Sequence, residues 1–256
     1  MRRHEAELQH VVPVQIGDGQ SPYAHTPDYR TVAELALARG LAQKYYLEAR
    51  TDELTNIGNR RAFNEDLQDA LEGVTETTNI AVLYLDVDGL KRVNDADGHD
   101  EGDRLLKMVA SSFRSGHDRQ EDTWYRLGGD EVVAIFQNVR SRGGQTVETV
   151  ARGMANRLEN RMNAEIGEED RWFDLHAGVS IGVAVNEPGD IVDTLLARAE
   201  ADMETNKGAR RKYLEERGIV FGDSRAIVGD PLLDARRTRK QWADSAIIDD
   251  YGTVVE

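Results

Sequence analysis

The stretch Arg126-Leu127-Gly128-Gly129-Asp130-Glu131 places two glycines and two carboxylates between two short runs of strand-forming residues. Residues 123–127 and 131–136 contain mostly β-branched, aromatic and other apolar side chains, as strands do. Adjacent glycines adopt the positive φ angles that a tight turn between antiparallel strands needs. The stretch therefore predicts a β-hairpin with Asp130 and Glu131 at its turn.

The segments on either side of this hairpin follow helical and strand patterns. Apolar residues recur at helical spacing in four segments, and apolar runs rich in β-formers predict two more strands. The predicted helices span residues 59–71, 102–113, 145–162 and 190–207, and the predicted strands span residues 80–87 and 174–185. Helices and an antiparallel sheet that share one core predict an α+β fold, an α/β sandwich with helices flanking a central, mainly antiparallel sheet.

The outer parts of the chain form separate predicted regions. We expect residues 1–30 to be irregular, because they combine proline, glycine and mixed polar residues. Residues 31–50 carry an apolar stripe at helical spacing, which fits a dimerisation helix or a helix packed on its own domain. Residues 51–213 form the main predicted domain. Residues 214–256 form a C-terminal extension with a candidate strand at 219–221 and a candidate helix at 232–243.

Composition narrows the class of protein. The 256-residue chain has a net charge of −15, which argues against broad binding to nucleic acid or to anionic membranes. It contains no cysteine, so disulfides and cysteine-ligated zinc are excluded. The longest apolar run, residues 80–85, is too short to cross a bilayer, and no signal peptide is evident. We therefore expect a cytoplasmic protein without a membrane segment.

Carboxylates gather near the predicted strand ends. Asp86 and Asp88 lie two residues apart at the end of a strand, so they project from the same face. If this strand pairs beside the hairpin, Asp86 and Asp130 meet at one end of the sheet. A few carboxylates together with substrate phosphates suit Mg²⁺, and two such ions can activate a hydroxyl and steady a leaving pyrophosphate. Solvated carboxylates near turns are the alternative, and Asp88 alone fits that alternative better.

Five segments together resemble the GGDEF family, the diguanylate cyclases. They occur in the family's order and at its spacing, and they comprise residues 52–63, 86–95, 98–103, 126–131 and 179–184. The resemblance covers roughly residues 52–212 and implies a ferredoxin-like, palm-type nucleotide cyclase domain. It further implies that a homodimer condenses two GTP molecules into cyclic di-GMP and releases two pyrophosphates. It also implies two Mg²⁺ or Mn²⁺ ions in each active site.

The resemblance also implies roles for individual residues. The metal ligands would be Asp86, the Val87 carbonyl and Asp130, while Glu131 would support the metals or help to deprotonate the attacking 3′-hydroxyl. Asn94 and Asp103 would bind the guanine edge, where a carboxylate can accept two N–H donors that adenine does not offer. The remaining substrate-binding positions would be Gly128, Gly129, the loop residues Leu90 and Lys91, and the phosphate-binding pair Lys207 and Arg211.

A second nucleotide site is implied ahead of the hairpin. Arg119-Gln120-Glu121-Asp122 matches the family's Arg-x-x-Asp motif for product inhibition in type and in distance. Arg119 would form a bidentate hydrogen bond with a guanine or phosphate of cyclic di-GMP, and Asp122 would accept hydrogen bonds from guanine N–H groups. An exposed ion pair that contributes little to stability is the alternative interpretation.

Several positions depart from the family pattern. Val132 and Leu90 replace aromatic residues, Glu200 and Glu204 replace an Asp and a Tyr, and Arg210 and Lys212 replace a Gly and an Asn. Glu204 stands out, because a charge there replaces a packing aromatic. These changes leave two alternatives to an active cyclase. One is a weak or inactive receptor for cyclic di-GMP or GTP, and the other is a cyclase that makes a different cyclic dinucleotide, against which Asp103 argues.

Overall fold

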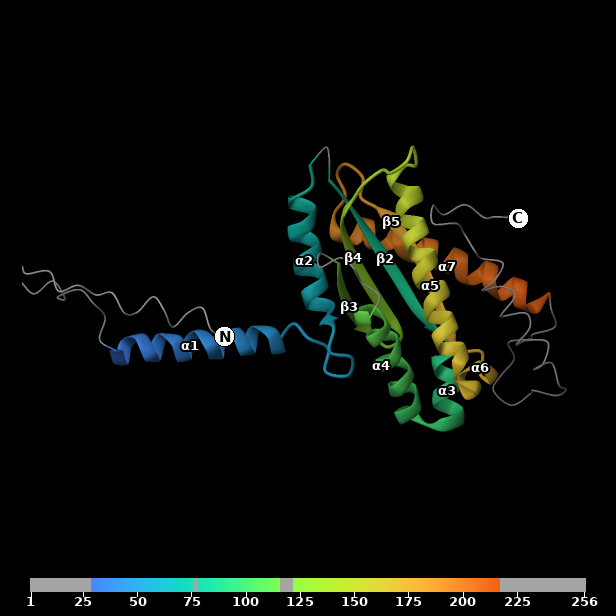
Figure 1. Ribbon diagram of the computed structural model, residues 1–256, viewed down its shortest axis with the longest axis horizontal. Helices are drawn as coiled ribbons and strands as arrows, with labels where there is room; N and C mark the ends of the chain where they lie inside the picture. Colours follow the sequence, from blue (N-terminus) through green and yellow to red (C-terminus); the bar gives the residue numbers. More distant parts are fainter. Residues whose placement is uncertain (1–28, 76–77, 116–121, 217–256) are drawn as a thin grey trace, which may run out of the picture. The chain divides into compact units, whose positions relative to one another are not determined.

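The computed structural model describes residues 29–75, 78–115 and 122–216 of the chain (Figure 1). Residues 1–28, the candidate strand at 219–221 and the candidate helix at 232–243 lie outside the described residues. The chain divides into two units, and the second begins at Arg50. Among the described helices, none has the length and apolar composition needed to cross a bilayer.

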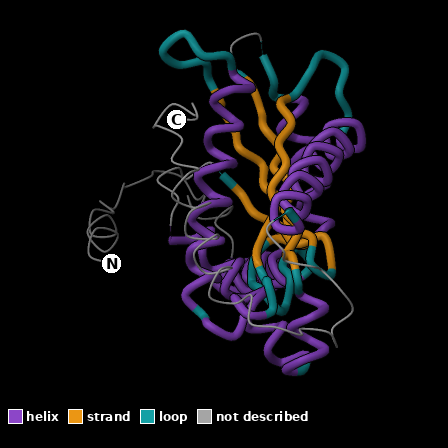
Figure 2. The backbone as a smooth tube through the Cα atoms, turned by 90° about the vertical axis from the view of Figure 1, so that its right-hand side faces the viewer, coloured by secondary structure: helices purple, strands orange, loops and turns teal. Residues whose placement is uncertain are grey.

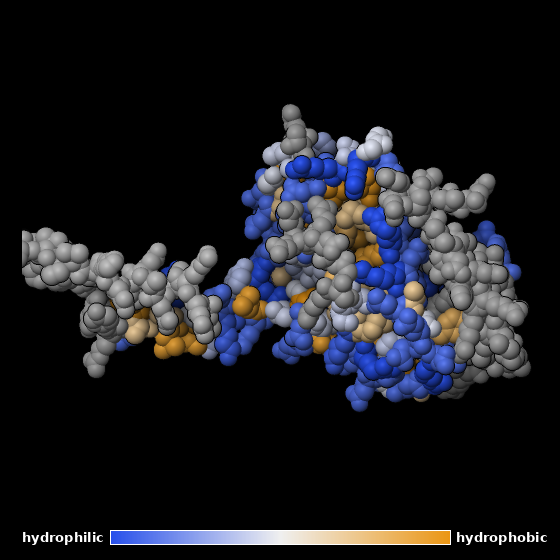
Figure 3. Space-filling model, in the orientation of Figure 1, coloured by the Kyte–Doolittle hydropathy of each residue, from blue (hydrophilic) through white to orange (hydrophobic). Residues whose placement is uncertain are grey.

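The first unit contains helix α1, Tyr29–Glu48. Its surface carries large apolar side chains, which appear in orange and pale tones in Figure 3. Those with the most exposed surface are Val32, Leu35, Leu37, Leu41, Tyr45, Tyr46 and Leu47, each at least 45% exposed. The predicted helix at residues 31–50 is confirmed, with its observed bounds shifted by two residues at each end.

The second unit is built on a five-stranded sheet in the order β1-β3-β4-β2-β5. The strands are β1 Gly58–Asn59, β2 Asn79–Asp88, β3 Thr123–Gly128, β4 Glu131–Val139 and β5 Gly178–Val185. Within the described residues, β1 pairs with β3 in parallel, and the other three pairings are antiparallel. The predicted α+β fold with a mainly antiparallel sheet is confirmed, and β2 lies between the hairpin β3–β4 and β5.

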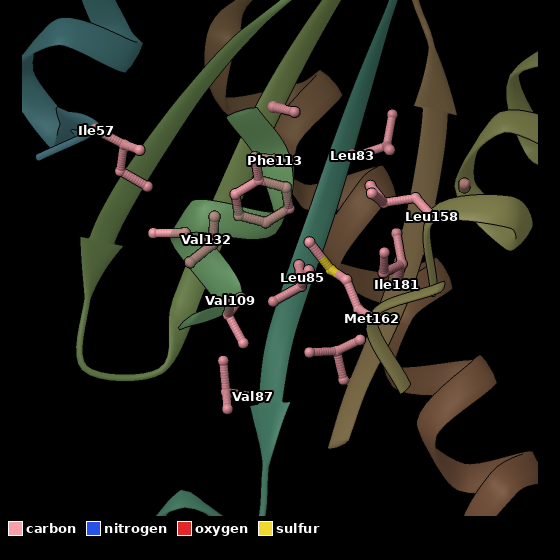
Figure 4. Packing of buried hydrophobic residues seen from close by; sticks show 14 of the residues in the cluster. Ile57, Leu83, Leu85, Val87, Val109, Phe113, Val132, Leu158, Met162 and Ile181 are labelled. Atoms are coloured by element: carbon pink, nitrogen blue, oxygen red, sulfur yellow. The ribbon is translucent and has the colours of Figure 1, made fainter. Parts of the chain in front are cut away.

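Helices cover both faces of this sheet, as the turned view shows (Figure 2). Strand β2 alternates: Leu83 and Leu85 pack into one core cluster, whereas Val82 and Tyr84 pack into another. The first cluster, part of which Figure 4 shows, includes apolar residues of α3, α4, α5 and α6. The second includes residues of α2 and α7. The helices are α2 Arg60–Glu72, α3 Leu90–Asp97, α4 His99–Ser115, α5 Val147–Glu168, α6 Asp170–Asp174 and α7 Val192–Glu215.

The structure corrects the prediction at three short elements. Strand β1 has only two residues, which are too few for a periodic signal, and the sequence pattern does not predict it. The strand predicted from residue 174 begins only at Gly178, since the preceding residues form the five-residue helix α6, whose Trp172 and Phe173 are buried. Leu90 and Lys91, which were predicted to lie in a loop, instead begin helix α3, and their phosphate-binding role stays a prediction.

Candidate active site

The candidate site lies where the end of β2 meets the start of β4. In this antiparallel pair Asp86 stands directly opposite Glu131, and the Val87 N–H donates to the Asp130 carbonyl at 3.1 Å. Gly128 and Gly129 are exposed at the turn between β3 and β4 and have φ angles of 144° and 53°, as predicted for the hairpin. The pairing therefore brings Asp86 and Asp130 to the same end of the sheet.

A cavity of about 250 Å³ opens at this end of the sheet. Most of its lining residues are charged, and they come from the end of β2, the β3–β4 turn, the start of α3, the α6–β5 connection and the last turns of α7. They are Asp86, Val87, Asp88, Gly89, Leu90, Lys91, Arg92, Asp130, His176, Lys207, Arg210 and Arg211. Three carboxylates thus face five Lys or Arg side chains around one cavity, which suits a polyanionic ligand that arrives with cations.

The predicted phosphate-binding lysine lies against the predicted metal ligand. Lys207 Nζ donates to Asp86 Oδ1 at 2.7 Å and lies 3.8 Å from Asp88 Oδ1. Burial raises the pKa of Asp86; Lys207 opposes this rise, and the neighbouring charges of Asp130 and Asp88 add to it. The second predicted cation, Arg211, lines the same cavity and pairs with Glu215 one turn along α7.

Asp88 is not a solvated carboxylate, which corrects the sequence-based interpretation. Ser180 Oγ donates to its Oδ2 at 2.7 Å, and Arg210 donates to the same oxygen at 3.0 Å. Arg210 also donates to the Val179 carbonyl and to Asn163 Oδ1, so it joins α7 to β2, β5 and α5. The side chain that departs from the family pattern at position 210 is therefore only 10% exposed and part of the cavity wall.

Behind this network lies a buried carboxyl group. Glu159 of α5 is 9% exposed, and burial raises its pKa to about 7; Arg210 opposes this rise and Asp88 adds to it. The sequence pattern did not indicate that Glu159 is buried, because a glutamate in a helix is usually solvent-exposed and only the packing of α5 shows otherwise.

Glu131 has two partners that sequence reasoning missed. Tyr84 donates its hydroxyl to Glu131 Oε1 at 2.7 Å, and Arg60 lies 3.5 Å from Oε2. Arg60 also donates to the Leu127 carbonyl at 3.0 Å, beside the turn. The spacing of Tyr84 two residues before Asp86 was the available signal, since it places both side chains on the same face of β2.

The start of α3 forms the wall beside β2. Gly89 precedes the helix with a φ of 79°, and an added Cβ would lie 3.1 Å from the His176 carbonyl, so this position needs glycine on two counts. The first backbone N–H groups of a helix have no intrahelical partner and suit an anion. Leu90 is buried, whereas Lys91 is exposed at the cavity.

The predicted guanine-binding residues lie together on α3 and α4. Asn94 packs against Gly102, where an added Cβ would come within 1.9 Å of Asn94 Oδ1, and Asp103 is the next residue. Neither Asn94 nor Asp103 is among the described residues that line the cavity, so the structure places them beside it rather than in it. Helix α6 is joined to the start of α4 beside these residues, because Trp172 donates its indole N–H to Glu101 at 2.7 Å.

The second predicted nucleotide site is described only in part. Asp122 is half-buried immediately before β3, whereas Arg119 lies outside the described residues.

Two of the positions that depart from the family pattern have simple structural settings. Val132 is 2% exposed and packs in the core cluster shown in Figure 4, and Glu204 is exposed, so its charge is solvated. Neither change leaves a charge buried.

Comparisons with known proteins agree with this geometry. A family-wide profile described as "Diguanylate cyclase, GGDEF domain" matches residues 49–213, more than half of the chain. The cyclic di-GMP phosphodiesterase NbdA of Pseudomonas aeruginosa is 34% identical over 164 residues, which cover 64% of this chain and 20% of that protein. The bifunctional diguanylate cyclase/cyclic di-GMP phosphodiesterase MucR of the same organism is 34% identical over 161 residues, covering 62% and 22%.

A solved structure supports the same assignment. The coiled coil and GGDEF domain of DgcB from Caulobacter crescentus, in complex with c-di-GMP, superposes with a TM-score of 0.59 at 27% identity. The match covers 70% of this chain and 92% of that one. The chain spans only about a fifth of the length of the two curated relatives. The family profile, the fold and the matched motifs together show that the chain belongs to the GGDEF-domain family of diguanylate cyclases.

Proposed function

We propose that this domain is an active diguanylate cyclase, which condenses two GTP molecules into cyclic di-GMP. The observation that carries the proposal is the convergence of Asp86, Asp130 and Glu131 with Lys207 and Arg211 at one end of the sheet. Some relatives are named as phosphodiesterases, so family membership alone does not establish cyclase activity. A domain that had lost catalysis would have little reason to retain these three carboxylates and both cations at one end of the sheet.

The residues present fit a metal ion that is held jointly with the substrate. Within the described parts of the chain, no group of three or more His, Cys, Asp or Glu side chains forms a metal cage. Mg²⁺, however, commonly binds one or two carboxylates and completes its shell with water and substrate phosphates. Asp86, Asp130 and the Val87 carbonyl would supply the protein ligands. Mg²⁺ or Mn²⁺ ions there, two per site in our proposal, would favour ionisation of the 3′-hydroxyl and neutralise charge on the leaving pyrophosphate.

The chain's own residues position the reactants. Lys207, Arg211 and the first N–H groups of α3 would bind the triphosphate, and Asn94 with Asp103 would hold the guanine. The 3′-oxygen of one GTP attacks the α-phosphorus of the other, so an O3′–P bond forms and the bond to the β-phosphate bridging oxygen breaks. Glu131 would help to accept the hydroxyl proton. Two such transfers give one cyclic di-GMP and two pyrophosphates.

The reaction requires two domains that face each other, so we propose a homodimer. Helix α1 supports this part of the proposal, because its large apolar side chains are exposed. The solved DgcB structure from Caulobacter crescentus likewise comprises a coiled coil as well as a GGDEF domain. We also propose that cyclic di-GMP inhibits the enzyme through Arg119 and Asp122. GTP is a cytoplasmic nucleotide, so the proposal places the reaction in the cytoplasm.

Incubation with GTP and Mg²⁺, followed by nucleotide chromatography, tests the proposal. Wild type should form cyclic di-GMP and pyrophosphate, and Asp130→Ala should lower the rate by about 100-fold or more because it removes a metal carboxylate. Asp69→Ala, at an exposed position of α2, is the matched control and should retain the wild-type rate. Activity per subunit should fall on dilution if the dimer is required.

Wild type that makes no cyclic product but binds cyclic di-GMP tightly would replace the cyclase with a receptor. Preference for ATP over GTP in the same assay would replace the product with another cyclic dinucleotide. Activity per subunit that stays constant far below the dimer dissociation constant would remove the dimer from the proposal.

A further inference from the structure

Two carboxylates stand directly opposite each other in the sheet. Asp86 on β2 and Glu131 on β4 form a cross-strand pair in the antiparallel register. Directly opposed side chains project from the same face with Cβ atoms about 5 Å apart, and like charges in this arrangement destabilise a sheet. Each carboxylate therefore needs a partner that draws it away from the other. Lys207 of α7 is that partner for Asp86, at 2.7 Å.

Tyr84 is the corresponding partner for Glu131. It pairs with Val133 in the register, so it lies diagonally to Glu131, within reach of an aromatic side chain. Its hydroxyl donates to Glu131 Oε1 at 2.7 Å. The second partner, Arg60, is 57% exposed and lies 3.5 Å from Oε2, a geometry that contributes little. Tyr84 thus makes the stronger of the two contacts with the carboxylate.

The two partners also differ in how firmly they are held. Tyr84 is 4% exposed and belongs to the apolar cluster beneath α2 and α7, so the packing of the core sets the position of its hydroxyl. The side chain of Glu131 is 37% exposed and would otherwise sample several rotamers. The rigid side chain therefore sets the orientation of the flexible one.

We infer that Tyr84 is a positioning residue for Glu131. Its hydroxyl occupies Oε1 and fixes the plane of the carboxylate, which keeps Glu131 apart from Asp86. Oε2, which the exposed Arg60 approaches at 3.5 Å, would then be oriented to accept the proton of the 3′-hydroxyl. This inference rests on the proposed cyclase function. A phenylalanine at position 84 would fill the same apolar space and lack only the hydroxyl.

A double-mutant cycle tests whether Tyr84 acts through Glu131. In the cyclase assay, Tyr84→Phe should lower kcat by about 10-fold, the value of one hydrogen bond to a charged group. In a Glu131→Gln background the same substitution should change kcat by less than about twofold, because the group that it positions has lost its charge. Equal losses in both backgrounds would overturn the inference, since they would mean that Tyr84 acts independently of Glu131.

Tyr125→Phe is the matched control. Tyr125 is 2% exposed, packs in the same cluster, and donates its hydroxyl to Asp66 at 2.8 Å, away from the site. Its substitution removes the same atom at a similar cost in stability and should leave kcat unchanged. Loss of activity in Tyr125→Phe equal to that in Tyr84→Phe would show that the effect is a general weakening of the core.

Binding of Mn²⁺ in the presence of a non-reactive GTP analogue separates this inference from the proposed function. Tyr84→Phe should weaken Mn²⁺ binding by about 3- to 10-fold, whereas Tyr125→Phe should not. That result in a protein that forms no cyclic product would keep the inference and reject the cyclase. A productive wild-type enzyme whose Mn²⁺ affinity and kcat are both unaffected by Tyr84→Phe would keep the cyclase and reject the inference. No Mn²⁺ binding by wild type would also reject it.

Discussion

Gly102→Ala offers a sharp test of the guanine-binding corner, because it separates stability from recognition. Gly102 is a buried residue in the first turn of α4 and does not have a positive φ angle. An alanine Cβ there would lie 1.9 Å from Asn94 Oδ1, 2.9 Å from its Cγ and 3.2 Å from Leu90 Cδ1. The nearest obstacle is the end of a rotatable side chain, so the backbone can stay in place while Asn94 turns away.

The magnitudes favour a folded protein with impaired recognition. Replacing a helical glycine by alanine stabilises a helix by about 1 kcal/mol, which offsets part of the cost of moving Asn94 and Leu90. Turning Asn94 away removes one recognition group for guanine, worth about 1–3 kcal/mol. This loss corresponds to a decrease in GTP affinity of about 5- to 150-fold, with a free energy of unfolding that changes by less than about 1 kcal/mol.

Two measurements check this prediction, with one control. Initial rates at varied GTP give KM, and urea unfolding gives stability. Gly167→Ala is the control, because Gly167 also lies in a helix and an added Cβ would meet nothing within 4 Å. The control should gain stability and keep the KM of wild type. An unchanged KM in Gly102→Ala would refute the placement of Asn94 against guanine, and destabilisation by several kcal/mol would refute the argument that Asn94 yields.

Two further predictions concern the network behind the cavity. Folding raises the pKa of Glu159 from 4.5 to about 7. The protonated Glu159 side chain therefore contributes fully to the free energy of unfolding below about pH 4.5, and this contribution is lost as pH rises through about 7. Glu159→Gln should therefore stabilise the protein by on the order of 2 kcal/mol at about pH 8 and by little at about pH 4, as measured by urea unfolding. The control, Glu168→Gln at an exposed position, should show no such pH dependence. Arg210→Gln should cost about 3 kcal/mol of stability, because it leaves Asp88 largely buried with a weaker partner, and the exposed Arg61→Gln should cost less than about 0.5 kcal/mol. A loss for Arg210→Gln as small as that for Arg61→Gln would contradict the network.

Local patterns accounted for most of the secondary structure. The hairpin at Gly128-Gly129 follows from glycine's freedom to take positive φ, and α2 begins where Asn59 accepts a hydrogen bond from the Ala62 N–H. Elements that are too short to show a period were missed. Helix α6 has five residues, and its helical form depends on burying Trp172 against the core rather than on its own propensity.

The sequence by itself determined the family, the mainly antiparallel α+β fold and the two strand ends that carry Asp86 and Asp130. These features depend on periodicity, turn chemistry and motif spacing, all of which are local along the chain. Only the tertiary structure decided which charges meet. Lys207 donates a hydrogen bond to Asp86, Arg210 to Asp88 and Tyr84 to Glu131. These pairs form because strand register and the packing of α7 bring together residues that are distant in sequence. A one-residue change of register of β2 would turn Tyr84, Asp86 and Asp88 to the other face of the sheet, so their partners depend on the assembled sheet.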